Sequence, residues 1–348
     1  MTAFFAQTES LESSPHARLR PRLGFVGVGW IGRNRMEAML ATGAVEAAAI
    51  ADTLPGNSAD AALLAPGAAR LPSLDALLGQ PLDGIVIATP SALHAEQAIT
   101  ALERGVAVFC QKPLGRSAAE VRAVIDAARK VDRLLGVDLS YRGTAAMRAI
   151  YERVRAGDLG HVHAVDLSFH NAYGPDKPWF HDPALSGGGC MIDLGIHLID
   201  LALWTLGFPE VEEIAADLFS RGKPLSDRTA QVEDYGLATL RLKGGIVVRI
   251  ACSWYLHAGQ DAVIAAEFHG SQGGASFRNV GGSFYDFQAQ LYRGTSREML
   301  AEPGDRWGGE IARAWAERLA RSPSFDPACE QFVPAAEVLD GIYAAACG

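Results

Sequence analysis

The chain has 348 residues, a length that predicts two domains of ordinary size. Its hydrophobic share of 49% and charged share of 20% are typical of a folded protein with a large core. The net charge of −9 argues against nucleic acid or an anionic membrane surface as a partner, and no apolar run comes near the roughly 18 residues of a membrane-spanning helix.

Residues 1–20 are predicted to form an N-terminal extension. Their basic residues follow the short apolar patch, which is the reverse of the order in a signal peptide, so we expect a disordered or loosely packed segment. The five cysteines are dispersed and form no CxxC pair. This pattern predicts reduced thiols, a cytoplasmic location and no metal site.

Residues 21–140 alternate short apolar runs with longer helical stretches. Strands are expected at 23–28, 45–52, 84–90, 106–113 and 133–140, and helices at 29–40, 91–105 and 117–130. Ser91 fits the N-cap of the second of these helices, and Gly105 fits its end. Strand–helix alternation of this kind predicts an α/β domain with a doubly wound parallel sheet, which is a dinucleotide-binding Rossmann fold.

The motif GVGWIG at residues 27–32 lies between the first predicted strand and the first predicted helix. Gly27 permits a tight turn, Gly29 lets the backbone approach a pyrophosphate, and Gly32 lets helix and strand pack closely. The phosphates of a dinucleotide would lie at the N-terminus of the following helix, where unpaired N–H groups favour anions.

Asp52 ends the second strand, where its carboxylate can accept hydrogen bonds from the ribose hydroxyls. None of residues 53–55 is basic, so no side chain there would neutralise a 2′-phosphate, and the sequence favours NAD over NADP. Arg33 either assists the phosphates or is an ordinary exposed arginine, and the sequence leaves both interpretations open.

Two predicted strands deliver unusual residues to one edge of the sheet: Thr89 and Pro90 after one, and Gln111, Lys112 and Pro113 after the other. Ligands of such sheets bind beyond the carboxyl ends of the strands. A partly desolvated lysine there can hold a hydroxyl or carbonyl oxygen of a substrate. On spacing alone, a solvated lysine at the end of a strand is the stronger interpretation.

The segment Gly187–Trp204 is apolar on nearly every side from residue 191 onward, as in a buried helix. It nevertheless carries Asp193, His197 and Asp200, whose spacings place them on one stripe of an α-helix. Buried charge is costly unless it is paired or used. Asp193 and His197 are therefore either a satisfied polar pair or catalytic, and Asp200 is interpreted as a structural partner.

These motifs together resemble the Gfo/Idh/MocA family, named for glucose–fructose oxidoreductase, inositol dehydrogenase and a rhizopine-catabolism protein. The matching residues, in the same order, are GxGxxG at 27–32, Thr89-Pro90 with His94, Lys112-Pro113, and GGG at 187–189 with Asp193 and His197. The resemblance implies a second domain at 141–348, an α+β domain for substrate binding and oligomerisation with a large, mostly antiparallel open sheet. It also implies oxidoreduction of a sugar, cyclitol or polyol with a nicotinamide cofactor.

By this resemblance Lys112, Asp193 and His197 form the catalytic set. His197 would act as general base in oxidation, Asp193 would orient the imidazole or relay the proton, and Lys112 would hold the reacting oxygen. The family usually has Glu-Lys-Pro, whereas this chain has Gln111, which keeps a hydrogen bond but not the charge. Lys112 is therefore expected to be less strongly held in its charged form. The predicted cofactor-binding residues are Gly27, Gly29, Trp30, Ile31, Gly32, Arg33, Asp52, Thr89, Pro90, His94, Gln111 and Lys112.

Residues 161–174 predict a strand with one buried face, formed by Val165, Leu167 and Phe169. The loop that follows is rich in aromatic and hydrogen-bonding groups, which suit a sugar, although a loop packed on the edge of the sheet is an equally good interpretation. The predicted substrate-binding residues are Lys112, Asn171, Tyr173, Trp179, His181, Asp193 and His197.

Further apolar runs at 235–242, 245–256, 262–270 and 282–292 predict antiparallel strands, and 307–322 and 333–347 predict closing helices. A large sheet with helices on one face leaves the other face to be covered, so we expect a homodimer or homotetramer.

The sequence thus predicts an NAD-dependent dehydrogenase acting on CH–OH groups of a sugar, cyclitol or polyol. A lyase or glycosidase of the same fold, in which NAD is reduced and regenerated within one turnover, needs the same lysine and histidine, and the sequence does not separate the two. A non-catalytic sugar or nucleotide sensor is the third possibility. Such a sensor has no evident need for Lys112, Asp193 and His197 together.

Overall fold

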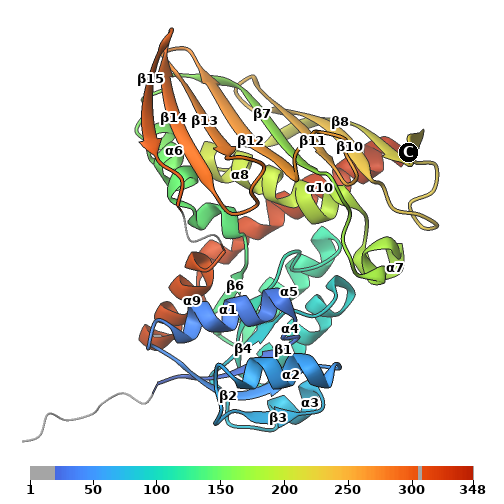
Figure 1. Cartoon of the computed structure of the whole chain (residues 1–348), viewed down its shortest axis with the longest axis vertical. Helices are drawn as coiled ribbons and strands as arrows, with labels where there is room; N and C mark the ends of the chain where they lie inside the picture. Colours follow the sequence, from blue (N-terminus) through green and yellow to red (C-terminus); the bar gives the residue numbers. More distant parts are fainter. Residues whose placement is uncertain (1–19, 305–307, 348) are drawn as a thin grey trace, which may run out of the picture.

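The computed structural model describes residues 20–304 and 308–347. The predicted N-terminal extension, residues 1–20, lies outside the described residues apart from its last one. The described part of the chain forms a parallel α/β unit and a second unit built on a larger sheet, and Figure 1 shows the two stacked on one another.

The first sheet has six parallel strands in the order β3-β2-β1-β4-β5-β6. The strands are β1 (Arg22–Val26), β2 (Glu46–Ala51), β3 (Ala69–Leu71), β4 (Gly84–Ile87), β5 (Ala107–Cys110) and β6 (Leu135–Val137). The helices between them are α1 (Trp30–Leu40), α2 (Pro55–Ala62), α3 (Leu74–Leu78), α4 (His94–Glu103) and α5 (Ala118–Lys130). Helices cover both faces, so β4 and β5 are buried at every position and are apolar or glycine throughout. The predicted Rossmann fold is confirmed.

Helix α9 (Glu310–Arg321) returns from near the end of the chain to this first sheet. Its apolar stripe joins the core formed by β1, β4 and α1, and the centroid of the Trp315 ring lies 5.6 Å from that of Phe109 on β5. A Cβ atom at Gly136 of β6 would lie 2.5 Å from the Trp315 ring, so this close approach requires glycine. The structure therefore places α9, which the sequence assigned to the domain at 141–348, in the core of the first domain.

The second sheet has nine strands in the order β15-β14-β13-β12-β7-β11-β10-β8-β9. Its strands are β7 (Val162–Asn171), β8 (Val211–Ser220), β9 (Lys223–Pro224), β10 (Tyr235–Leu242), β11 (Ile246–Ser253), β12 (Ala262–Gly270), β13 (Gly274–Asn279), β14 (Phe287–Arg293) and β15 (Ser296–Ala301). Neighbouring strands are antiparallel except for the parallel pair β7–β11. The predicted large, mostly antiparallel sheet is confirmed.

Helices α6 (Ala145–Arg155), α8 (Ile196–Leu206) and α10 (Phe332–Cys347) lie on the face of this sheet that is turned toward the first domain (Figure 1). Val165, Leu167 and Phe169 of β7 are buried beneath them, as the alternation predicted. Helix α10 contacts both α8 and β8 of the second domain and α5 of the first. The last helix of the chain thus bridges the two units.

The opposite face of the second sheet carries several ion pairs between neighbouring strands. Arg249 of β11 donates two hydrogen bonds to the carboxylate of Asp166 on β7, at 2.5 and 2.7 Å, and Arg278 of β13 pairs with Glu267 of β12. Charged side chains are well solvated by water, so the part of this face that carries them can stay exposed. The expected homodimer or homotetramer stays a prediction.

The largely helical segment Pro183–Leu206 includes α7 (Pro183–Ser186), a bend at residues 187–189, a π-turn at Met191–Gly195 and α8. Its length and mean hydropathy of 1.4 meet the measure of a membrane-spanning helix, which the sequence analysis had not found. Of the 18 most apolar consecutive residues in this segment, 83% are buried inside the protein, as expected of the core helix of a folded domain.

The packing of α9 yields a stability test. Trp315→Ala should lower the free energy of unfolding by about 3–5 kcal/mol, because it leaves a cavity between α9 and β5. Trp315→Phe should cost much less, since the indole N–H is buried without a hydrogen-bond partner among the described residues. Urea unfolding measures both variants. Equal urea midpoints for Trp315→Ala and the unaltered protein would contradict the assignment of α9 to the first core.

Candidate active site

A cleft of about 1060 Å³ lies between the two domains and is lined by residues from both. Most of the predicted cofactor residues line it: Gly27, Gly29, Trp30, Ile31, Asp52, Thr89, Pro90, His94, Gln111 and Lys112. Gly32 and Arg33 are not part of the wall.

The glycine turn has the geometry that its residues predict. Gly27 has a φ of +76°, and a Cβ atom there would lie 2.4 Å from the carbonyl oxygen of Ala88. A Cβ atom at Gly32 would lie 2.0 Å from the carbonyl oxygen of Gly27, so the turn packs against α1 at a distance that only glycine allows. Arg33 instead pairs with the exposed Asp60 of α2 at 2.7 Å, which fits the interpretation of an ordinary exposed arginine.

Asp52 is held at the end of β2 by a ring of donors. The backbone N–H groups of Val28 and Leu54 donate to its carboxylate at 2.8 Å each, and the amide of Asn57 donates at 3.2 Å. The lining residues nearest to Asp52 in the chain are Thr53, Leu54 and Asn57, and none of these three is basic. An acidic group with no basic neighbour fits the free ribose hydroxyls of NAD and disfavours a 2′-phosphate.

Lys112 and Asp193 meet across the cleft, one from each domain. Lys112 Nζ donates to Oδ1 of Asp193 at 2.7 Å and to the backbone carbonyl oxygen of Asp193 at 2.6 Å. The other carboxylate oxygen accepts a hydrogen bond from Nε1 of Trp254 at 3.2 Å. Both charged side chains are largely withdrawn from water, so the pair is a partly buried ion pair and not a solvated lysine.

The residues around Asp193 form a π-turn, Met191–Gly195, and α8 begins only at Ile196. The predicted stripe assumed one continuous α-helix, and a π-turn changes the direction in which Asp193 projects relative to His197. Among the described residues, no hydrogen bond joins these two side chains. The oxygens of Asp193 instead bind Lys112 and Trp254, and the role predicted for Asp193, to orient the imidazole or relay the proton, stays a prediction.

His197 lies in the wall of the cleft, on the first turn of α8, with only 6% of the residue exposed. The Tyr141 ring meets the imidazole edge-on, at a centroid distance of 4.9 Å. Nδ1 is buried with no hydrogen-bond partner among the described residues. Burial, followed by the positive charges of Lys112 and Arg35, holds the pKa of His197 well below its usual 6.5. The imidazole is therefore neutral and able to accept a proton.

Two other candidates have their polar side-chain atoms engaged by partners within the protein. Asp200 accepts hydrogen bonds from Nε and Nη2 of Arg142 at 2.8 and 2.5 Å, as its interpretation as a structural partner requires. Both ring nitrogens of His94 lie 2.7 Å from backbone carbonyl oxygens, those of Pro113 and Thr89. Both ring nitrogens of His94 therefore contact the backbone that follows β4 and β5. Ser91 is not an N-cap, because a 3-10 turn at Ser91–Leu93 precedes α4.

Three of the four candidates that the sequence predicted in the substrate loop line the cleft. Asn171 presents a buried Oδ1 without a hydrogen-bond partner among the described residues. Tyr173 also lines the cleft, half-exposed, and Trp179 does so with its ring stacked on Phe180 at 3.8 Å. His181 is not part of the wall, and its ring packs edge-on against Trp254.

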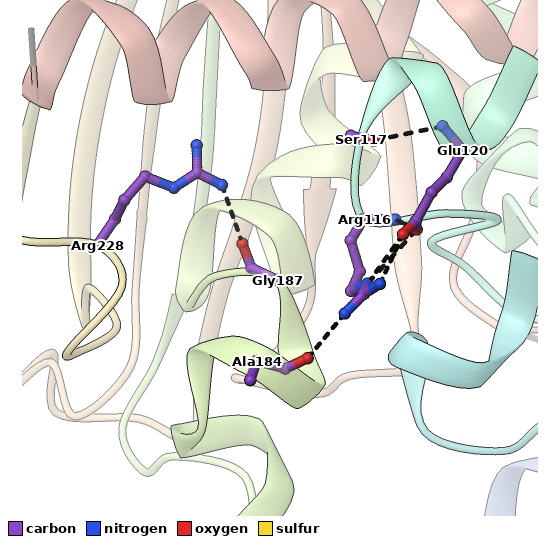
Figure 2. A network of polar contacts seen from close by, with 6 residues as sticks. All are labelled: Arg116, Ser117, Glu120, Ala184, Gly187 and Arg228. Atoms are coloured by element: carbon purple, nitrogen blue, oxygen red, sulfur yellow. Dashed lines mark hydrogen bonds and ion pairs between the residues drawn. The ribbon is translucent and has the colours of Figure 1, made fainter.

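A polar network ties the strand that carries Lys112 to the segment that carries Asp193 (Figure 2). Arg116 follows Lys112 by four residues, forms an ion pair with Glu120 at 2.6 Å and donates to the carbonyl oxygen of Ala184 in α7 at 2.8 Å. On the other side, Arg228 approaches the carbonyl oxygen of Gly187 at 3.4 Å. The loop before the π-turn is thus held from two directions.

Several site residues escaped the sequence reasoning. They are Arg35, Asn57, Arg116, Asp138, Tyr141 and Trp254. Asp138 had a usable signal, because it follows a strand whose neighbours deliver Thr89 and Lys112 to the same edge. The others gave none, since an arginine in a helix or a tryptophan after a strand is ordinary.

A glycine turn at a helix N-terminus, an acidic end of β2, a strand-end lysine and a histidine line one cleft, and together they define an oxidoreductase with an NAD-binding Rossmann domain. Two family models agree: "Oxidoreductase family, NAD-binding Rossmann fold" matches residues 21–139, and "GFO/IDH/MocA C-terminal domain" matches residues 147–276. The chain belongs to the Gfo/Idh/MocA family of oxidoreductases, as the resemblance predicted.

Among curated relatives, a putative UDP-kanosamine synthase oxidoreductase subunit of Amycolatopsis mediterranei (strain S699) is 30% identical over 349 residues, covering 93% of this chain and 96% of that protein. D-Glucoside 3-dehydrogenase of Escherichia coli (strain K12) is 28% identical over 234 residues. That alignment spans 64% of either protein, so less than two thirds of the relative is matched. A solved structure of levoglucosan dehydrogenase with NADH and levoglucosan shares the fold, with a TM-score of 0.79 at 22% identity over 94% of this chain and 97% of that one.

The Arg116 tie predicts a local change in dynamics. Arg116→Met should speed amide hydrogen exchange in residues 183–195 by roughly tenfold, because it removes a charged donor worth about 1.5–3 kcal/mol. The matched control is Arg122→Met, which breaks an exposed pair with Glu337 between α5 and α10 and should leave that segment unchanged. Equal exchange in both variants would show that Arg116 does not hold the loop.

The state of His197 predicts a pH dependence of stability. Below pH 6.5 the unfolded chain binds a proton at His197 that the native protein does not, so this residue costs stability as the pH falls from 6.5 toward its lower native pKa. His197→Asn removes that cost. Urea unfolding at several pH values should therefore show the advantage of the variant growing as the pH falls. A constant difference would mean that His197 titrates normally.

Proposed function

We propose that the protein is an NAD-dependent dehydrogenase that oxidises a CH–OH group of a sugar, cyclitol or polyol. The observation that carries this proposal is the meeting of the Lys112–Asp193 ion pair and a neutral His197 in the wall of one cleft with the glycine turn. An ammonium group and a neutral imidazole supply the two functions that carbinol oxidation needs, which are a cation for the oxygen and a base for its proton.

Bound NAD would supply the acceptor for the hydride of the carbinol carbon. The described residues fit it, since the turn at Gly27 and Gly29 opens at the N-terminus of α1 and Asp52 faces the ribose position. The strand-end residues Thr89 and Lys112 lie farther along the same wall, at the carboxyl ends of β4 and β5.

In this proposal Lys112 holds the substrate oxygen and stabilises the negative charge that develops as its proton leaves. Asp193 keeps Nζ directed into the cleft, by the 2.7 Å ion pair. His197 takes the proton during oxidation and returns it during reduction. Because its pKa is lowered, it is already deprotonated at neutral pH and ready to act as base.

The substrate side of the cleft suits a sugar ring. Asn171 offers an unpaired carbonyl oxygen for a hydroxyl, and Trp179 and Phe180 offer aromatic surface for the C–H face. The names of relatives point the same way: one is a D-glucoside 3-dehydrogenase and another an inositol 2-dehydrogenase. A homo-oligomer and a cytoplasmic location are further expectations that accompany this proposal.

Nicotinamide reduction followed by absorbance tests the proposal. The protein, at substrate-level amounts, would be mixed with NAD or NADP and a panel of aldoses, polyols, cyclitols and glycosides. Sustained NADH formation with one compound is expected. NADPH instead of NADH would contradict the argument from Asp52. NADH only stoichiometric with the enzyme, while the compound is consumed, would indicate the internal-redox lyase, and ligand binding without any chemistry would indicate a sensor.

With the active compound, Lys112→Met should lower kcat by about 10²–10³-fold, and His197→Asn by about 10²–10⁴-fold. Both variants should keep their affinity for NAD, since neither side chain holds the pyrophosphate or ribose. Lys130→Met, at the far end of α5, is the matched control and should keep full activity. Unaltered turnover in either cleft variant would remove that residue from the catalytic set.

A further inference from the structure

Two polar side chains, one of them from the residue next to Lys112 in the chain, donate to a single carboxylate oxygen of a third in the wall of the cleft. Gln111 follows β5, Asp138 follows β6 and Arg35 lies in α1, and all three are buried. Gln111 Nε2 donates to Asp138 Oδ2 at 2.5 Å, and Arg35 Nε donates to the same oxygen at 2.6 Å. The cluster links α1, which begins after the glycine turn, to the segment after β5 that carries Lys112.

This cluster is a poor way to stabilise a fold. Arg35 and Asp138 are each 1% exposed, and burying such a pair costs about as much as the attraction returns. The second oxygen of Asp138 is buried with no hydrogen-bond partner among the described residues, which adds a further penalty. An apolar pair of similar size would fill the same space at less cost, so the charged arrangement needs another reason.

The neighbourhood of Lys112 supplies that reason. The residue immediately before Lys112 is Gln111, whose side chain carries no charge. The structure shows a carboxylate within hydrogen-bond distance of that glutamine, on the adjacent strand β6. The pair 111–138 therefore holds one acid and one amide, with the acid at position 138.

We propose that Asp138 is a positioning residue for Lys112, supplying from β6 the carboxylate that residue 111 lacks. The inference rests on the proposed function. Through Gln111, Asp138 fixes the backbone end of the lysine, while Asp193 fixes its Nζ at 2.7 Å. Because a hydrogen bond to a charged acceptor is roughly twice as strong as one to a neutral acceptor, the charge at position 138 matters as well as the shape. Arg35 keeps that charge in place.

Exchanging the acid and the amide tests this inference. Asp138→Asn should lower kcat by about tenfold, the order expected when one charge-assisted hydrogen bond is weakened, with the Kd for NAD unchanged. Gln111→Glu alone puts two carboxylates in contact and should also lower kcat. The double variant Gln111→Glu/Asp138→Asn again holds one acid and one amide. It should return kcat to within about threefold of the unaltered protein.

A second measurement does not depend on turnover. Competitive acetylation, quantified by mass spectrometry, reports how firmly Lys112 is held, with Lys130 as an internal reference. Labelling of Lys112 should be several-fold faster in Asp138→Asn and return to the original rate in the double variant. Thermal unfolding of every variant separates loss of fold from loss of positioning. If Asp138→Asn fails to fold, kcat and the labelling of Lys112 in the double variant test the inference instead, because that variant keeps one acid and one amide at positions 111 and 138.

The outcomes separate this inference from the proposed function. No nicotinamide reduction by the unaltered protein would overturn the proposed function, and the labelling of Lys112 would still test the role of Asp138. Equal kcat and equal labelling in the unaltered protein and Asp138→Asn would overturn the inference alone. A folded double variant that is no better than Asp138→Asn would overturn it too, because the carboxylate would then be needed at 138 for another purpose.

Discussion

The ion pair between Lys112 and Asp193 is the interaction on which the arrangement of the cleft depends. It joins the end of β5 in one domain to the π-turn in the other, with a distance of 2.7 Å between Nζ and Oδ1. Such a partly buried pair is favourable only if its geometry is held, since two charges lose water. The surrounding structure fixes this geometry in two ways. Helix α10 contacts both domains, and Arg116 donates a hydrogen bond to the carbonyl oxygen of Ala184, shortly before the π-turn (Figure 2).

The π-turn separates two functions that a plain α-helix would have combined. In an α-helix, Asp193 and His197 would lie one turn apart and share a proton. In the structure Asp193 turns toward Lys112, and His197 is left neutral, with no carboxylate of the described residues against its Nδ1. A carboxylate partner would raise the pKa of the imidazole, whereas burial and nearby cations lower it. The extra backbone residue thus favours a histidine whose imidazole is already deprotonated at neutral pH, and the lowered pKa also makes it a weaker base than a free imidazole.

The sequence predicted the elements whose signal is local, and it missed those fixed by distant contacts. The glycine turn and the apolar parallel strands can each be recognised from a few consecutive residues. The amphipathic pattern of α9 shows that one face is buried, but not that it is buried under Phe109, two hundred residues earlier in the chain. Strands β8, β13 and β15 were missed because their inward residues are too few or too irregular to form an alternation. Arg35 and Asp138, 103 positions apart, meet only after folding.

The charges in the cleft bear on what it can accept. Among the described residues that line it, Arg35 pairs with Asp138, Lys112 with Asp193 and Lys177 with Asp176, while Asp52 is held by backbone N–H groups. No lysine or arginine of this wall is left without a carboxylate, and His197 is neutral. The Lys177–Asp176 pair is exposed and long, at 3.4 Å, so a phosphorylated ligand would displace it at little cost, whereas the other two pairs are withdrawn from water. Under the proposed function, an uncharged sugar or polyol needs only hydrogen bonds and aromatic surface, which Asn171 and Trp179 offer, and it leaves all three ion pairs intact.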